Sequence, residues 1–175
     1  MNIIDLIESF NFSTKIIWRE KDNAELGDFS IDDENYRILI EHYEMNLILD
    51  SGKVLKSADQ VAFSRVESNV EIVDKADSKS PSKVFGAVRN GIIEKIDPKL
   101  DAVIFSAKKI SGDSFDTFSK RSKLYERLAK SVWKQSAFGY IDQKHTDKNG
   151  DHFILVNKQL RLTENEINEI LKKIS

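Results

Sequence analysis

Two features of the sequence combine residue types that can do chemistry. The first is the polar segment that leads to Ser80, Pro81 and Ser82, with Lys83 beside them, where a predicted helix begins. A helix N-terminus presents unpaired backbone N–H groups and a partial positive charge, so this segment can bind an anion. The second feature is Tyr125, which lies beside the apolar stripe of a later predicted helix. Its phenol can either pack in the core or exchange a proton in a cleft.

Other catalytic and ligand-binding signatures are missing from the sequence. No Walker-type loop, no serine nucleophile elbow and no glycine-rich dinucleotide turn is found. The absence of cysteine excludes disulfides, thiolate metal sites and a cysteine nucleophile. His42, His145 and His152 do not have metal-ligand spacing, so we assign them structural or surface roles and predict no metal site. The acidic run at 32–34 is interpreted as a solvated turn between two strands.

Length and composition predict one globular domain over residues 1–175. The chain has 175 residues, of which 40% are hydrophobic and 32% are charged, and a core of that size fits a single domain. Lysine and arginine number 27 against 29 acidic residues, so we expect neither nucleic-acid nor membrane binding. No apolar run approaches the roughly 18 residues of a membrane span, and the first ten residues lack the positive charge of a secretory signal. A cytoplasmic location is the expectation.

Hydrophobic periodicity in the first half of the chain predicts a short N-terminal helix followed by strands. The helix is expected at 2–10, and the strands at 15–20, 25–31, 35–42, 43–49 and 60–66, with 70–73 continuing the last of them. Ser80 is the expected N-cap of the next helix and Pro81 its first residue. Apolar residues at three- and four-residue intervals carry that helix to Ile96, and an apolar strand follows at 101–107.

The second half of the chain predicts a helix, a hairpin and a closing helix. Leu124, Leu128 and Val132 form an apolar stripe with Tyr125 one step round, and strands at 138–144 and 152–158 bracket a tight turn. Thr163 to Glu166 has the pattern of a capping box before a C-terminal helix. The fold class expected is α+β, with a mixed, mainly antiparallel sheet on which helices pack.

The order of these elements resembles the second half of a GNAT-type N-acetyltransferase over about residues 58–158. The blocks that carry the resemblance are the strand, polar loop and helix around Ser80, the run Leu-Tyr-Glu-Arg-Leu at 124–128, and Phe-Gly-Tyr at 138–140. The resemblance implies a GNAT-like β-β-β-α-β-α-β-β order with short helices at both ends of the chain. It also implies that acetyl-coenzyme A is the cofactor.

The same resemblance assigns roles to individual residues. Backbone amides around Ser80, Ser82, Lys83 and Val84 would bind the pyrophosphate of acetyl-coenzyme A. Tyr125 would be the general acid that protonates the departing thiolate. The acceptor would be an amine of a small molecule or of a protein, and the sequence identifies neither the acceptor nor the general base.

The sequence is also similar to an uncharacterised group of small proteins of tailed bacteriophages. Phe105-Ser106-Ala107, the run Arg121 to Tyr125, and Gly139-Tyr140 carry that similarity. It says nothing about a reaction, but it indicates a viral accessory protein made in a bacterial host, where an acetyltransferase-like scaffold could serve to bind a host or virion protein. Two hypotheses therefore stand: an acetyl-coenzyme A-dependent N-acyltransferase, and a non-enzymatic interaction protein on the same scaffold.

Overall fold

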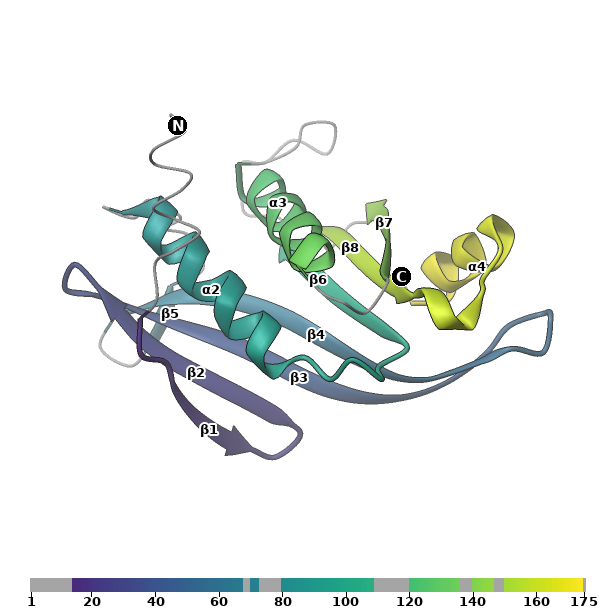
Figure 1. Cartoon of the computed structure of the whole chain (residues 1–175), viewed down its shortest axis with the longest axis horizontal. Coiled ribbons are helices and arrows are strands. Elements are labelled where there is room, and N and C mark those ends of the chain that lie inside the picture. The colour runs from purple at the N-terminus through teal and green to yellow at the C-terminus, as the bar shows by residue number, and fades with distance from the viewer. Residues whose placement is uncertain are drawn as a thin grey trace. The chain divides into compact units, whose positions relative to one another are not determined.

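The computed structural model describes residues 14–67, 70–72, 80–108, 120–135, 140–146 and 150–174. It is an α+β fold with a mixed β-sheet (Figure 1). The strands are β1 (Ile17–Lys21), β2 (Ala24–Ile31), β3 (Glu34–Ile48), β4 (Val54–Glu67), β5 (Val70–Ile72), β6 (Ala102–Lys108), β7 (Tyr140–Thr146) and β8 (Gly150–Asn157). The helices are α2 (Pro81–Lys95), α3 (Lys120–Gln135), the short 3₁₀-helix η1 (Lys158–Leu160) and α4 (Glu164–Ile174).

The chain divides into two compact units. The first consists of Met1–Glu41 and Ala62–Lys95, and the second of His42–Val61 and Ile96–Ser175. Strands β3 and β4 contribute residues to both units.

An antiparallel meander of β1, β2 and the first part of β3 forms the base of the first unit. Asp32 and Asp33 join β2 to β3 with φ values of 49° and 66°, and positive φ at both central residues is the geometry of a type I′ hairpin turn. Helix α2 packs on the meander, where Gly91 lies against the side chains of Ile16 and Ile38. A glycine at this position lets the helix approach the strands closely.

Glu34, the last residue of the acidic run, is buried at the start of β3. Its carboxylate accepts a hydrogen bond from the Tyr36 hydroxyl at 2.8 Å and forms an ion pair with Arg65 of β4 at 3.0 Å. A buried charge requires such partners. The prediction of a solvated turn is therefore wrong for Glu34, although Asp32 and Asp33 are exposed.

The second unit contains a parallel pair of strands. Residues 58–61 of β4 lie beside 102–105 of β6 in parallel register, and β6 then pairs antiparallel with β8, which pairs antiparallel with β7. The sheet order is β1-β2-β3-β4-β6-β8-β7, with β5 pairing to the end of β4. Helix α3 packs on β6, β7 and β8. Because parallel strands cannot be joined by a tight turn, the chain crosses from β4 to β6 through the connection that contains α2.

Some predicted element boundaries need correction. The strands expected at 35–42 and 43–49 form one strand, β3, since no glycine, proline or other turn-forming residue interrupts the chain at His42 and Tyr43. Strand β4 begins at Val54, six residues before the expected start, directly after the turn at 50–53. The predicted helix at 2–10 and the tip of the predicted hairpin turn at 147–149 lie outside the described residues.

Helix α4 covers one end of the sheet in the second unit. It contributes Ile170 and Leu171 to an apolar cluster. The other buried members are Leu49, which directly follows β3, and five residues of β4, β6 and β8: Leu55, Ala58, Ala102, Ile154 and Val156. Asp101 directly precedes β6 and joins it to β4. Its carboxylate accepts hydrogen bonds from the N–H groups of Lys56 at 2.6 Å and Ser57 at 3.2 Å. The burial of Ile170 and Leu171 in the apolar cluster confirms the predicted apolar face of the C-terminal helix.

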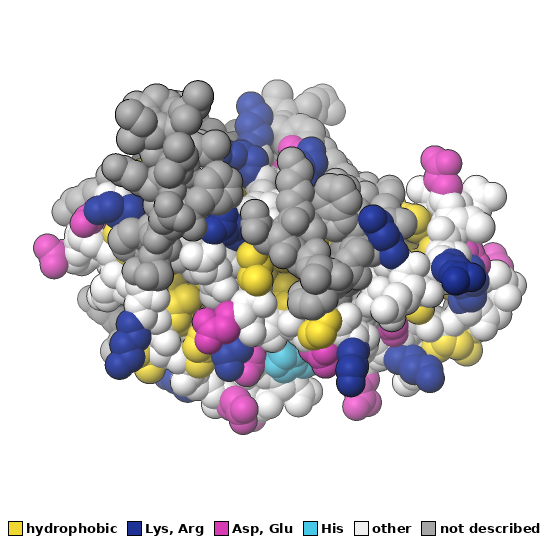
Figure 2. Space-filling view, viewed as in Figure 1, with side chains coloured by type: hydrophobic (Ala, Val, Ile, Leu, Met, Phe, Trp, Pro, Cys, Tyr) yellow, Lys and Arg dark blue, Asp and Glu magenta, His cyan; other side chains and the backbone are white. Residues whose placement is uncertain are grey.

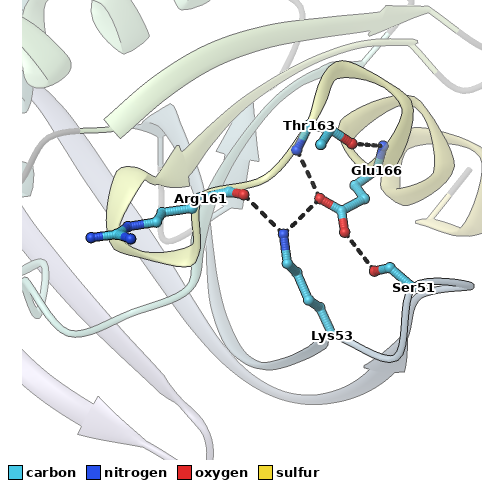
Figure 3. Close-up of polar contacts among 5 residues, drawn as sticks. All are labelled: Ser51, Lys53, Arg161, Thr163 and Glu166. Atoms are coloured by element: carbon cyan, nitrogen blue, oxygen red, sulfur yellow. Dashed lines mark hydrogen bonds and ion pairs between the residues drawn. The ribbon is translucent and has the colours of Figure 1, made fainter.

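Polar contacts hold the start of α4 against the turn that follows β3 (Figure 3). The Glu166 carboxylate accepts hydrogen bonds from the Ser51 hydroxyl at 2.5 Å, the Thr163 N–H at 2.7 Å and the Lys53 ammonium at 2.9 Å. In return the Glu166 N–H donates to the Thr163 hydroxyl at 3.3 Å, which confirms the predicted capping box. Lys53 also donates to the carbonyl of Arg161 at 2.9 Å. One carboxylate thus joins two segments that are far apart in the sequence.

These contacts make the stability of the protein depend on the ionisation of Glu166. The hydrogen bonds from Ser51, Thr163 and Lys53 lower the pKa of Glu166 from 4.5 to about 2. The unfolded chain therefore binds a proton at a higher pH than the folded chain does. The stabilisation is present above about pH 4.5 and is lost as the pH falls toward the folded pKa of about 2.

We predict that Glu166→Gln destabilises the protein at neutral pH, and that the difference from the wild type shrinks as the pH falls through this window. Urea unfolding of both proteins at a series of pH values measures the difference. Glu164→Gln is the matched control, because Glu164 is exposed in the same first turn and its variant should follow the wild type. A Glu166→Gln penalty that stays constant from neutral to acid pH would contradict the assigned role of the carboxylate.

Candidate cofactor site and buried tyrosine

The four residues predicted to bind a pyrophosphate lie together at the start of α2, in the first unit. Ser80 precedes the helix, and its carbonyl accepts a hydrogen bond from the Val84 N–H at 3.1 Å, so Ser80 occupies the N-cap position. Pro81 is the first helical residue and has no N–H. Ser82 and Lys83 therefore supply the N–H groups of the first turn that precede the helix's own hydrogen-bond ladder.

A carboxylate from another segment faces this helix start. The Ser80 hydroxyl donates to Asp32 Oδ2, and the Lys83 ammonium lies 3.7 Å from Asp32 Oδ1. The side chains of Asp32 and Lys83 are 43% and 47% exposed. A carboxylate here is stabilised by the same partial positive charge that would attract a phosphate. An anionic ligand at α2 must therefore compete with Asp32.

Tyr125 lies on α3, in the second unit, and it is the largest fully buried side chain of the described residues, at 1% exposure. Leu128, Ala129 and Val132 continue the buried stripe of the same helix. The predicted pair on the outside is confirmed, since the Lys130 ammonium donates to Glu126 at 2.8 Å. Tyr125 is thus a core residue, while its catalytic role stays a prediction.

Sequence reasoning missed three polar clusters in the second unit. His42 Nδ1 lies 2.7 Å from Asp59 Oδ1. The Gln60 amide donates to the Ser106 hydroxyl at 3.1 Å, and Ser106 Oγ lies 3.0 Å from His152 Nδ1. The third cluster joins α3 to β8, with Ser122 and Thr146 donating to the buried carboxylate of Asp151.

The partners in these clusters are separated by up to 46 residues in the sequence. No local spacing motif therefore reveals them. Ser106 gives a sequence signal, because it is a polar residue in the otherwise apolar run 102–107 of β6, whereas Asp59 lies among other polar residues of β4.

The described residues show neither a metal centre nor a membrane-spanning helix. In these ranges no three or more histidine and acidic side chains are grouped so as to hold a metal ion. None of the helices in the described ranges has both the length and the apolar character needed to cross a bilayer. Basic and acidic side chains are interspersed over the described part of the face in Figure 2.

Comparison with known proteins adds no family assignment. No protein-family model, curated protein or solved structure matches the chain.

The packing of Tyr125 predicts how two substitutions should differ in their effects on stability. Tyr125→Phe keeps the ring and removes one polar atom, so it should cost about 1 kcal/mol, the contribution of one buried hydrogen bond. Tyr125→Ala also removes the ring from the core and should cost about 3–5 kcal/mol. Urea unfolding measures both free energies. Similar costs for the two variants would contradict the assignment of the ring to the core.

Proposed function

We propose that this protein is an acetyl-coenzyme A-dependent N-acyltransferase with a GNAT-like fold. The observation that carries the proposal is the strand order around the parallel pair. Helix α2 lies in the connection between β4 and β6, α3 follows β6 and carries Leu-Tyr-Glu-Arg-Leu, and the β7–β8 pair returns so that β8 lies beside β6. For this part of the chain the resemblance implies the same succession of strand, helix, strand, helix and strand pair, whereas five strands, β1 to β5, precede α2 where the resemblance implies three.

The start of α2 supports cofactor binding through its exposure. Each of the three described α-helices has a carboxylate at its first turn: Asp32 at α2, Asp151 at α3 and Glu166 at α4. Asp151 and Glu166 are buried at 4% and 7% exposure, whereas the side chain of Asp32 is 43% exposed. Of these three helix starts, the one at α2 is therefore the one where a phosphate can most easily replace the carboxylate.

In the proposed reaction the amine nitrogen of the acceptor attacks the thioester carbonyl of acetyl-coenzyme A, and the carbon–sulfur bond breaks. The leaving thiolate takes a proton from the hydroxyl of Tyr125.

A second candidate function is a phage-type accessory protein that binds a host or virion protein without catalysis. Two observations favour it. Asp32 provides a negative charge at the helix start that would have to receive the pyrophosphate. The sequence from Lys75 to Ser82 also contains no glycine, which would otherwise allow phosphates a close approach to the backbone.

Thermal unfolding with acetyl-coenzyme A separates the two functions. A ligand that binds only the folded state raises the melting temperature, so the wild type should be stabilised at millimolar acetyl-coenzyme A. Asp32→Asn removes a negative charge beside the proposed pyrophosphate, and asparagine tolerates the positive φ of the turn. A charge at about 4 Å contributes about 1 kcal/mol in water, so the variant should bind about fivefold more tightly.

Asp33→Asn is the matched control, since it changes the charge by the same amount at the neighbouring exposed residue of the same turn. Its affinity should be close to that of the wild type. If acetyl-coenzyme A stabilises none of the three proteins, the acyltransferase is contradicted and the binding protein is favoured. Equal gains for Asp32→Asn and Asp33→Asn would place the cofactor away from α2.

A further inference from the structure

Strand β7 lies at one edge of the sheet in the second unit. It is the last strand in the sheet order, and within the described residues it pairs only with β8. Helix α3 packs on β6, β7 and β8 together, so it covers a face of these strands and not the edge. An edge strand carries a row of backbone N–H and C=O groups that can pair with another extended chain. The seven residues Tyr140–Thr146 offer these groups.

A second copy of β7 can pair with this edge only in certain registers. Two identical strands related by a two-fold axis run antiparallel, and in an antiparallel ladder hydrogen-bonded and non-hydrogen-bonded positions alternate. Because paired residues occupy positions of the same kind, the axis must pass beside one residue, which then lies opposite its own copy. The middle residue of β7 is Gln143, and the register centred on it pairs the whole strand.

The sequence of β7 is complementary in charge to its own copy in this register. Asp142 would lie opposite Lys144 of the second copy, and Lys144 opposite Asp142 of the second copy. Opposite charges directly across two strands stabilise a sheet, and like charges destabilise it. Moving the axis by one residue in either direction would place Asp142 or Lys144 opposite its own copy. The register that pairs all of β7 is therefore also the one that its charges favour over both neighbours.

Strand β1, at the other end of the sheet order, lacks this complementarity. Its middle residue is Arg19, so pairing of the whole strand with its copy would place two guanidinium groups opposite each other. An axis at Glu20 would oppose two carboxylates, and an axis at Trp18 would bring no opposite charges together. Charge therefore favours self-pairing at β7 and opposes it at β1.

We propose that this protein forms a two-fold symmetric dimer through β7, with Gln143 on the axis and an Asp142–Lys144 pair on each side of it. The occupant of the β7 edge is thus a second copy of this chain. This inference does not depend on acyl transfer, because none of the residues to which that reaction assigns chemistry lies on β7. Pairing of one strand buries less surface than a standard protein interface, so the dimer forms reversibly and only at high protein concentration.

Sedimentation equilibrium of the full chain, from about 5 to about 500 µM, measures the dissociation constant of the dimer. Asp142→Lys places like charges opposite each other at both pairs, and Lys144→Asp does the same with the other sign. Each single variant should raise the dissociation constant about 10- to 100-fold.

Two further samples test the register itself. The double variant Asp142→Lys/Lys144→Asp exchanges the two charges and should regain the dissociation constant of the wild type. An equimolar mixture of the two single variants should also form a dimer, because every lysine at these positions then lies opposite an aspartate. Recovery in these samples separates a charge effect from a failure of a single variant to fold.

Glu20→Lys is the matched control, because it makes the same charge reversal at an exposed residue of the edge strand β1. Its dissociation constant should equal that of the wild type. A wild type that stays monomeric at about 500 µM would overturn the dimer. A dimer that either single variant leaves intact, or that the double variant or the mixture fails to restore, would overturn the pairing through β7.

Discussion

The parallel pairing of β4 with β6 is the constraint on which the arrangement of the other elements depends. Parallel strands require a crossover, so the chain leaves β4, forms α2 and only then enters β6. The other edge of β6 is completed by β8, which the chain reaches after α3 and β7. The first turn of α2 and the buried face of α3, to which the proposed acyl transfer assigns chemistry, both lie in connections that this strand order makes necessary.

A second regularity is the placement of carboxylates at helix starts. Unpaired N–H groups and the helix dipole favour a negative charge there, and Asp32, Asp151 and Glu166 supply one each. The three carboxylates differ in the other groups that they contact. Glu166 joins α4 to the turn after β3 by a hydrogen bond from Ser51, and Asp151 joins α3 to β8 by a hydrogen bond from Ser122, so both are structural. Asp32 lies on an exposed turn, and its carboxylate contacts Ser80 and Lys83 at the start of α2.

The same three carboxylates show how far sequence reasoning reaches. The capping box of α4 was predicted, because Thr163 and Glu166 are three residues apart in the chain and satisfy each other's backbone N–H groups. Asp32 and Asp151 reach their helices from 48 and 29 residues away, and no local pattern reveals such pairs. The α+β class and the helices at 81–95 and 120–135 followed from periodicity, whereas the length of β3 did not, because its exposed middle shows neither alternation nor a turn signal.

The central claim is that acetyl-coenzyme A binds at the start of α2. The most direct measurement is an NMR titration of the ¹⁵N-labelled protein with acetyl-coenzyme A, with the amides assigned. The account predicts that the N–H signals of Ser82 and Lys83 shift and saturate as the ligand is added. The absence of shifts at both residues at millimolar ligand would contradict it.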